Sequence, residues 1–174
     1  FKFAYSKKLA NPLVDNLGTG YFTICRLKNG HYVGLSGLCH SDIFHVLDSD
    51  LNIVKRFGGF PLDGLTTDGS TTNMTLSFMG NLVNHGNSIY YAANKFGYIA
   101  RYDITDDLEI KLVWENFYSK TDYRIDNRQV KFGSDNLHGF SGIAVGKDYI
   151  FTTFSGIPTQ QMYKERSAYA VDAK

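Results

Sequence analysis

The sequence predicts an all-β fold, a β-propeller with antiparallel four-stranded blades, and three observations support this prediction. A strand pattern occurs three times, over residues 21–57, 82–117 and 140–174. Each copy has a glycine turn after its first strand, and the interval between these turns is typical of propellers and other repeat arrays. Aromatic residues make up 15% of the chain, with 12 Tyr and 13 Phe, and such residues favour pleated sheet.

The first copy should contain four strands. An apolar strand ends before the turn at Gly30, a second strand with aromatic and aliphatic residues follows, and a third ends at Asp48. The polar segment 48–50 then predicts a hairpin turn into a fourth strand, because Asp and Ser side chains bond to nearby backbone in turns.

The second copy, with its glycine turn at Gly86, shows the clearest alternation of side chains. Tyr91 should point to one face of the sheet, and Tyr90 and Ala92 should point to the other. The acidic run 103–107 should form a hairpin turn equivalent to the one that begins at Asp48.

The third copy, with its glycine turn at Gly146 after a first strand, stops at Lys174, where the other two copies continue. Propellers have four to eight blades, so a ring cannot close from three. We therefore expect residues 1–174 to be a single partial propeller domain with about three blades, and the native protein to be about twice as long.

The connections 61–75 and 119–137 lack sustained alternation and are rich in Asp, Thr, Ser, Asn and Gly. They are predicted to be long loops, and loops of this length are often functional.

Composition excludes several classes of function. The chain has 18 Lys and Arg against 17 Asp and Glu, so nucleic acid is not an expected partner. No apolar run is long enough to span a bilayer, and the first residues lack a signal sequence. Cys25 and Cys39 are too few for a disulfide framework, and they are either buried thiols or one disulfide. No cofactor is expected.

Three stretches resemble one family, the TolB-like six-bladed β-propeller proteins of Bacteroides-type bacteria. They are KRFGGFP at 55–61, SFMGNLVNHGNSIYYAANKFGYIARYDI at 77–104 and GFSGIAVGKDYIFTTFSG at 139–156. The resemblance implies a six-bladed propeller in an exported protein, periplasmic or associated with the outer membrane. Many family members are predicted lipoproteins, so it also implies a possible lipid anchor outside this chain. It supplies no catalytic residues.

Motifs for metal binding or nucleophilic catalysis fail on spacing. The run beginning at Asp48 starts like a calcium loop, but Ile53 stands where glycine is needed and Gly59 where glutamate is needed. Ser36 and Ser141 lie in GLSG and GFSG, which lack the spacing of a nucleophile elbow, so packing roles are favoured. No histidine pair has zinc-binding spacing, and no metal is expected.

The predicted binding site lies where loops of successive blades meet at one mouth of the propeller. The loops 35–42, 93–97 and 155–164 should share this face with the two long connections. The residues expected to converge there are His40, Lys95, Phe96, His138 and Gln160. Convergent polar groups beside an exposed aromatic would suit recognition, although ordinary solvated loop residues remain the alternative.

Three classes of function are expected. The first is a non-enzymatic binding or scaffold module with a protein, peptide or glycan as partner, in the bacterial cell envelope that the resemblance implies. The alternative is a propeller enzyme, a lyase or hydrolase with its active site at the channel mouth. The third is a structural role in an envelope assembly. Fold alone does not choose between them.

Overall fold

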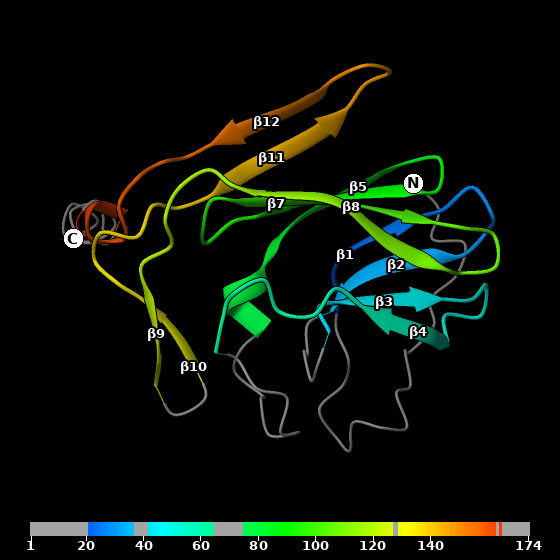
Figure 1. Cartoon of the computed structure of the whole chain (residues 1–174), viewed down its shortest axis with the longest axis horizontal. Helices are drawn as coiled ribbons and strands as arrows, with labels where there is room; N and C mark the ends of the chain where they lie inside the picture. The colour runs from blue at the N-terminus through cyan, green and yellow to red at the C-terminus, as the bar shows by residue number, and fades with distance from the viewer. Residues whose placement is uncertain (1–20, 37–41, 65–74, 127–128, 163, 165–174) are drawn as a thin grey trace, which may run out of the picture.

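Two antiparallel four-stranded sheets form most of the structure, a computed structural model that describes residues 21–36, 42–64, 75–126, 129–162 and 164. Strands in both sheets pair in their order along the chain (Figure 1). The first sheet contains β1 Tyr21–Arg26, β2 Tyr32–Ser36, β3 Phe44–Leu47 and β4 Ile53–Phe57. The second contains β5 Gly80–His85, β6 Ser88–Ala93, β7 Tyr98–Ile104 and β8 Ile110–Phe117. The predicted antiparallel four-stranded sheets are confirmed, whereas closure into a propeller stays a prediction.

The third copy opens as expected, with an antiparallel pair of strands. These strands are β11 Phe140–Val145 and β12 Ile150–Phe154. A short helical segment begins at Thr159, and the third strand predicted to end at Asp172 lies outside the described residues.

The prediction that 119–137 is a strand-free loop is wrong. This segment contains a hairpin of β9 Tyr123–Asp126 and β10 Gln129–Phe132. Val130 is 8% exposed and belongs to the main core, and Tyr123 and Phe132 pack against that core. Each strand has four residues, too few for alternation to stand out from a polar loop. The other connection ends in a 3-10 helix, η1 Thr75–Phe78.

The turns repeat between the two four-stranded sheets. Gly30 and Gly86 have φ of 91° and 64°, a conformation that glycine adopts without strain. In the turn after β3, the Asn52 amide donates to Asp48 Oδ1 at 2.8 Å, which supports the hairpin interpretation over a calcium loop. In the turn after β7, the Glu109 amide donates to Thr105 Oγ1 at 3.0 Å.

Thr105 is therefore the structural equivalent of Asp48. The equivalent predicted from the sequence, Asp103, instead lies inside β7. The repeat extends to an unusual backbone conformation, because Leu51 and Leu108 occupy the same place in the two turns with φ of 64° and 61°. Both copies therefore use one turn geometry with different side chains.

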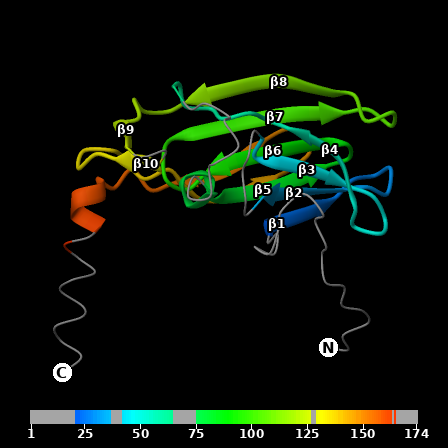
Figure 2. The same cartoon turned by 90° about the horizontal axis from the view of Figure 1, so that it is seen from below.

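The first strands of the three copies lie side by side, with β5 between β1 and β11. Strands β1 and β5 are neighbours in both views (Figures 1 and 2), and β11 lies on the other side of β5 (Figure 1). Two asparagines of β5 bridge to the neighbouring sheets. Asn84 Nδ2 donates to the Arg26 carbonyl at 2.7 Å, and Asn81 Nδ2 donates to the Phe140 carbonyl at 3.3 Å. The sheets are thus joined along their first strands by side chains, without forming one continuous sheet.

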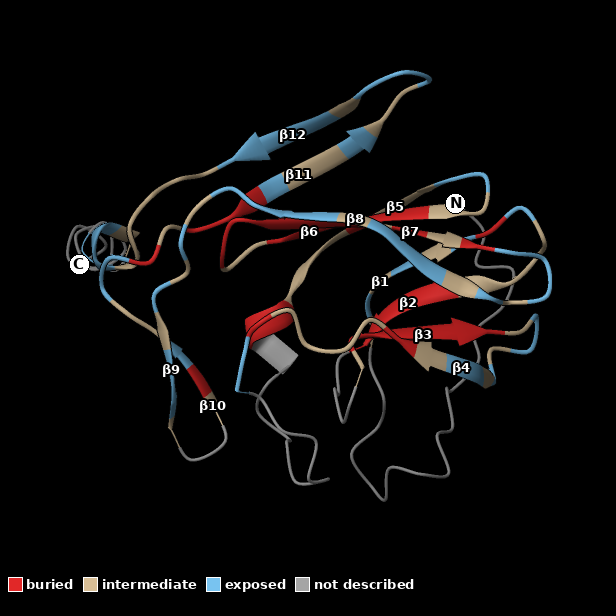
Figure 3. Cartoon of the chain, in the orientation of Figure 1, coloured by how far each residue is buried: buried red, intermediate tan, exposed pale blue. Residues whose placement is uncertain are grey.

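Strand β6 contributes to two cores, because its side chains alternate as predicted. Tyr91 packs in the large core between the first and second sheets. Ala92 points the other way and packs with Ile99 and Phe140 in a smaller core beneath the third copy. Figure 3 shows the result, with β6 mostly buried and β12 mostly exposed.

Candidate functional site

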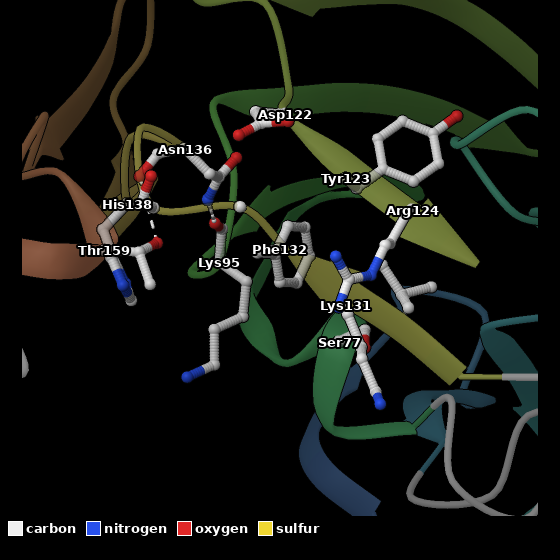
Figure 4. Close-up of a pocket in the computed structure, with 13 residues that line it drawn as sticks. Ser77, Lys95, Asp122, Tyr123, Arg124, Lys131, Phe132, Asn136, His138 and Thr159 are labelled. Atoms are coloured by element: carbon white, nitrogen blue, oxygen red, sulfur yellow. Dashed lines mark hydrogen bonds between the residues drawn. The ribbon is translucent and has the colours of Figure 1, made fainter. Parts of the chain in front are cut away.

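The candidate site is an open cavity of about 760 Å³, a size suited to a small ligand. It lies where the β6–β7 loop, η1, the β9–β10 hairpin and the segment leading into β11 meet (Figure 4). Its lining residues are Ser77, Lys95, Asp122, Tyr123, Arg124, Val130, Lys131, Phe132, Gly133, Ser134, Asn136, His138 and Thr159.

Asn136 fixes one wall of this cavity. It is 1% exposed, and its Nδ2 donates to the Lys95 carbonyl at 2.8 Å. Thr159 is bound to the same residue, because its amide and its Oγ1 both donate to the Asn136 carbonyl, at 2.9 and 3.1 Å. Hydrogen bonds of Asn136 therefore join the segment before β11 to the β6–β7 loop and to the segment that begins at Thr159.

Gly139 brings the third copy close to the β6–β7 loop. Its amide donates to the Asn94 carbonyl at 2.9 Å. A Cβ atom at this position would overlap the backbone oxygens of Ala93 and Phe96, so only glycine permits this approach. The close approach places His138, the preceding residue, beside the cavity.

Cationic side chains predominate among the charged residues that line the cavity. Lys95, Arg124 and Lys131 line it together with one carboxylate, that of Asp122. Lys131 Nζ also forms an ion pair with Asp126 at 2.7 Å. The hydrogen bond and charge of Lys131, with a further contribution from Arg124, lower the pKa of the Asp126 carboxyl.

Two aromatic residues add an apolar part to the lining. Phe132 stacks on Phe96 with ring centroids 5.9 Å apart, so its ring is supported from the core side. The hydroxyl of Tyr123 donates to the Asp63 carbonyl at 3.0 Å. Such a combination of aromatic surface and fixed polar groups suits the binding of a small organic molecule.

The structure brings together some of the residues that the sequence analysis selected. Lys95 and His138 both line the cavity. Gln160 lies beside it, where its Nε2 donates to Asp135 Oδ1 at 3.3 Å. His40 lies outside the described residues. That any of these residues binds a ligand stays a prediction.

The expectation that Phe96 is an exposed aromatic is wrong. Its side chain is 0% exposed and packs against Phe78, Tyr98 and Phe132. Phe96 lies behind Phe132, which is the ring that faces the cavity. The aromatic contribution to the site therefore comes from the hairpin and not from the loop between β6 and β7.

Sequence reasoning missed Arg124, Lys131 and Asn136 because it treated residues 119–137 as one undivided loop. The sequence does place a basic residue between apolar residues in each short strand, in Tyr123-Arg124-Ile125 and Val130-Lys131-Phe132. Three residues of alternation are too few to distinguish a strand from a loop, so this signal did not predict the hairpin.

A smaller cavity of about 250 Å³ adjoins the first, and Lys95 and His138 line both. Its other lining residues are Met79, Asn94, Gly139, Phe140, Ser141, Ser155 and Met162. Lys95 and His138 are therefore shared by the two cavities, and the smaller cavity is the more apolar of the two.

The remaining sequence candidates lie elsewhere or have structural roles. Ser36 is 1% exposed within the first sheet, and Ser141 Oγ donates to the Thr153 carbonyl at 3.4 Å. Cys25 is a free thiol, whereas Cys39 lies outside the described residues. Across the described ranges, no group of three His, Cys, Asp or Glu residues is placed to hold a metal ion.

Comparisons with known proteins give no match to a protein-family model, to a curated protein or to a solved structure. In the part of the chain that the structure describes, no helix has the length and apolar character needed to cross a membrane.

Proposed function

We propose that this protein is a non-enzymatic binding module of the bacterial cell envelope and that the 760 Å³ cavity is its ligand site. The envelope setting rests on the resemblance to TolB-like propeller proteins. The observation that carries the binding role is the convergence of η1, the β6–β7 loop, the β9–β10 hairpin and the Thr159 segment on one cavity. Sites built from several loops on a rigid scaffold are typical of recognition.

The proposed scaffold is part of a six-bladed propeller. The adjacent first strands β1, β5 and β11 support this proposal, because each sheet then extends outward from a shared centre as blades do. In that arrangement, connections between sheets gather at one end of the molecule, where the cavity lies.

The proposal is tested by blocking the cavity. Ser134 is exposed and lines the cavity, so Ser134→Trp should fill part of it without disturbing the core. Thr152→Trp on the exposed face of β12 is the matched control. Both variants and the parent chain are screened by thermal denaturation against hexoses, sugar acids, sugar phosphates and short peptides.

We expect at least one probe class to raise the melting temperature of the parent and of Thr152→Trp, but not that of Ser134→Trp. The proposal is wrong if no probe shifts the parent, or if every shift survives in Ser134→Trp.

A further inference from the structure

The turn between β1 and β2 carries the only Asn-Gly pair in the sequence, Asn29-Gly30. We infer that Asn29 is a self-modification site, at which the folded turn promotes attack of the Gly30 nitrogen on the side chain, loss of ammonia and conversion to aspartate or isoaspartate. This inference goes beyond the proposed function, because Asn29 is not among the residues that line the cavity. The hydrogen bonds at the side-chain oxygen of Asn29 and the open space around Gly30 carry it.

The side-chain oxygen of Asn29 accepts two hydrogen bonds from His31. The His31 amide donates to Asn29 Oδ1 at 3.1 Å, and His31 Nδ1 lies 3.3 Å from the same oxygen. Because this oxygen only accepts hydrogen bonds, Nδ1 is assigned as the protonated ring nitrogen. The bond from an amide two residues ahead is an Asx turn, in which the side chain folds back over the intervening peptide group. This turn brings Asn29 Cγ toward the Gly30 nitrogen.

The same two donors favour the reaction itself. When the Gly30 nitrogen bonds to Asn29 Cγ, negative charge develops on Oδ1, and donors already aimed at that oxygen stabilise it. The bond between Cγ and Nδ2 then breaks, and the proton of the Gly30 amide leaves with Nδ2 as ammonia. A five-membered succinimide ring remains, and water opens it at either carbonyl to give aspartate or isoaspartate.

Gly30 presents the attacking nitrogen with little obstruction. Its φ is 91°, and apart from its chain neighbours no heavy atom lies within 4 Å of the place that a Cβ would occupy. Water can therefore approach the ring once it has formed. The Gly30 amide donates to the Leu27 carbonyl at 3.2 Å, at the long end of the usual range, so the hydrogen bond that opposes the attack is weak.

The leaving nitrogen is held by no hydrogen bond. Asn29 Nδ2 is buried and has no hydrogen-bond partner among the described residues. A buried donor without an acceptor is unfavourable, so the loss of this nitrogen as ammonia removes a cost of the folded turn.

The modified turn would lie at the junction of the first two sheets, beside the turn between β5 and β6 (Figure 1). The Asn29 amide donates to Asn87 Oδ1 and the Lys28 amide donates to the Gly86 carbonyl, both at 3.3 Å. Asn87 Nδ2 in turn donates to Asp106 Oδ1 at 2.9 Å. A carboxylate at residue 29 adds a second negative charge to this junction, and isoaspartate adds one methylene to the backbone. Modification should therefore loosen the contact between the two turns.

Peptide mass spectrometry of protein kept in mildly alkaline buffer measures the conversion, because replacing the side-chain amide by a carboxyl group raises the peptide mass. The reference is a synthetic peptide of residues 24–34, which contains the same Asn-Gly pair outside the folded protein. We expect Asn29 to convert at least about threefold faster in the folded chain than in the peptide, a factor within the range that one hydrogen bond supplies.

A pair of histidine variants assigns the effect to the ring donor. His31→Ala keeps the backbone amide and removes the ring, so conversion in the folded chain should slow about threefold, while the same change in the peptide should have little effect. His85→Ala, at the exposed end of β5 before Gly86, is the matched control and should leave the rate at Asn29 unchanged. Unchanged melting temperatures show that both variants remain folded.

Conversion in the folded chain that is no faster than in the peptide would show that the turn does not promote the reaction, and the inference would be overturned. Equal rates in His31→Ala and His85→Ala would overturn the role of the His31 ring. Hydrogen exchange before and after conversion tests the junction, where the amides of Lys28 and residue 29 should exchange faster in the converted protein. Unchanged exchange at these amides would contradict the loosening of the two turns.

Discussion

Strands β6 and β12 occupy the same position in their sheets, yet their surroundings differ. Each is the second strand of the hairpin that opens its copy of the repeat, and each carries aromatic residues. Tyr91 in β6 is 0% exposed, whereas Phe151 in β12 is 63% exposed. The sequences IYYAA and IFTTF predict strands equally well, so the difference lies in the neighbours.

The neighbours of β6 cover it on all sides. It pairs with β5 and β7, one face packs on the first sheet, and the other faces Phe140 of the third copy. Strand β12 pairs with β11 alone among the described strands. Position in a repeat therefore decides strand formation, whereas burial depends on which copies lie on either side.

Replacing one aromatic residue in each strand by alanine should give the largest difference in stability between β6 and β12. Tyr91→Ala removes a fully buried ring and the hydrogen bond from its hydroxyl to the Phe78 carbonyl, which is 2.7 Å long. We expect it to lower the free energy of unfolding by about 3–5 kcal/mol, and Phe151→Ala to lower it by less than about 1 kcal/mol. Urea denaturation measures both, and equal losses would show that β12 is covered in solution.

Glycine substitutions test where the third copy is anchored. Gly139→Ala would drive a methyl group into the backbone oxygens of Ala93 and Phe96, and we expect a loss of about 1–3 kcal/mol. Gly142→Ala is the matched control within β11, because its methyl group would meet nothing within 4 Å. Urea denaturation measures both variants. An unchanged free energy of unfolding in Gly139→Ala would mean that the backbone around residue 139 shifts at little cost to accommodate the methyl group.

Features of the fold that depend on local backbone geometry could be predicted from the sequence. Local features such as Gly30, Gly86 and the alternation around Tyr91 depend on backbone geometry and period, so the sequence predicts them. The equivalence of Thr105 and Asp48 was misplaced because either side chain can accept the hydrogen bond of the turn. Several residue types can accept this hydrogen bond, so the sequence predicts that a turn is present but not which residue begins it.

The candidate site was harder to predict because it depends on contacts between distant segments. Phe96 follows Lys95 and precedes Gly97, which is typical of an exposed loop, yet its ring packs on Phe78 and Phe132. Lys95 was selected for its loop position alone, and it lines the cavity, whereas a role in binding stays a prediction. Asn136 gives no sequence signal, since its role arises from a hydrogen bond across 41 positions.

Cysteine reactivity gives a further contrast between the sheets. Burial raises the pKa of the Cys25 thiol in β1 to about 12, so little thiolate forms at pH 8. A cysteine introduced as Thr152→Cys lies on exposed β12 and should react with iodoacetamide at least about tenfold faster. Peptide mass spectrometry resolves the two sites. In urea, Cys25 should react as fast as the introduced cysteine. Comparable reaction rates of the two thiols in the folded protein would show that Cys25 is not protected by burial.

The smallest effects should come from the two asparagines that join β5 to its neighbours. Asn81→Ala removes bonds to the Phe140 carbonyl and to Asn94 Oδ1, in a partly buried position. Asn84→Ala removes an exposed bond to the Arg26 carbonyl, which water can replace. We expect losses of about 1 kcal/mol for Asn81→Ala and less for Asn84→Ala.

Hydrogen exchange shows where each of these losses falls. The second and third copies share only a small core, so Asn81→Ala should speed exchange of β11 amides while the amides of β2 and β3 keep their protection. Asn84→Ala should leave both regions nearly unchanged, because the large core still holds the first and second sheets together. If Asn81→Ala instead accelerated exchange in β2 and β11 equally, the third copy would be part of one cooperative unit with the first two sheets.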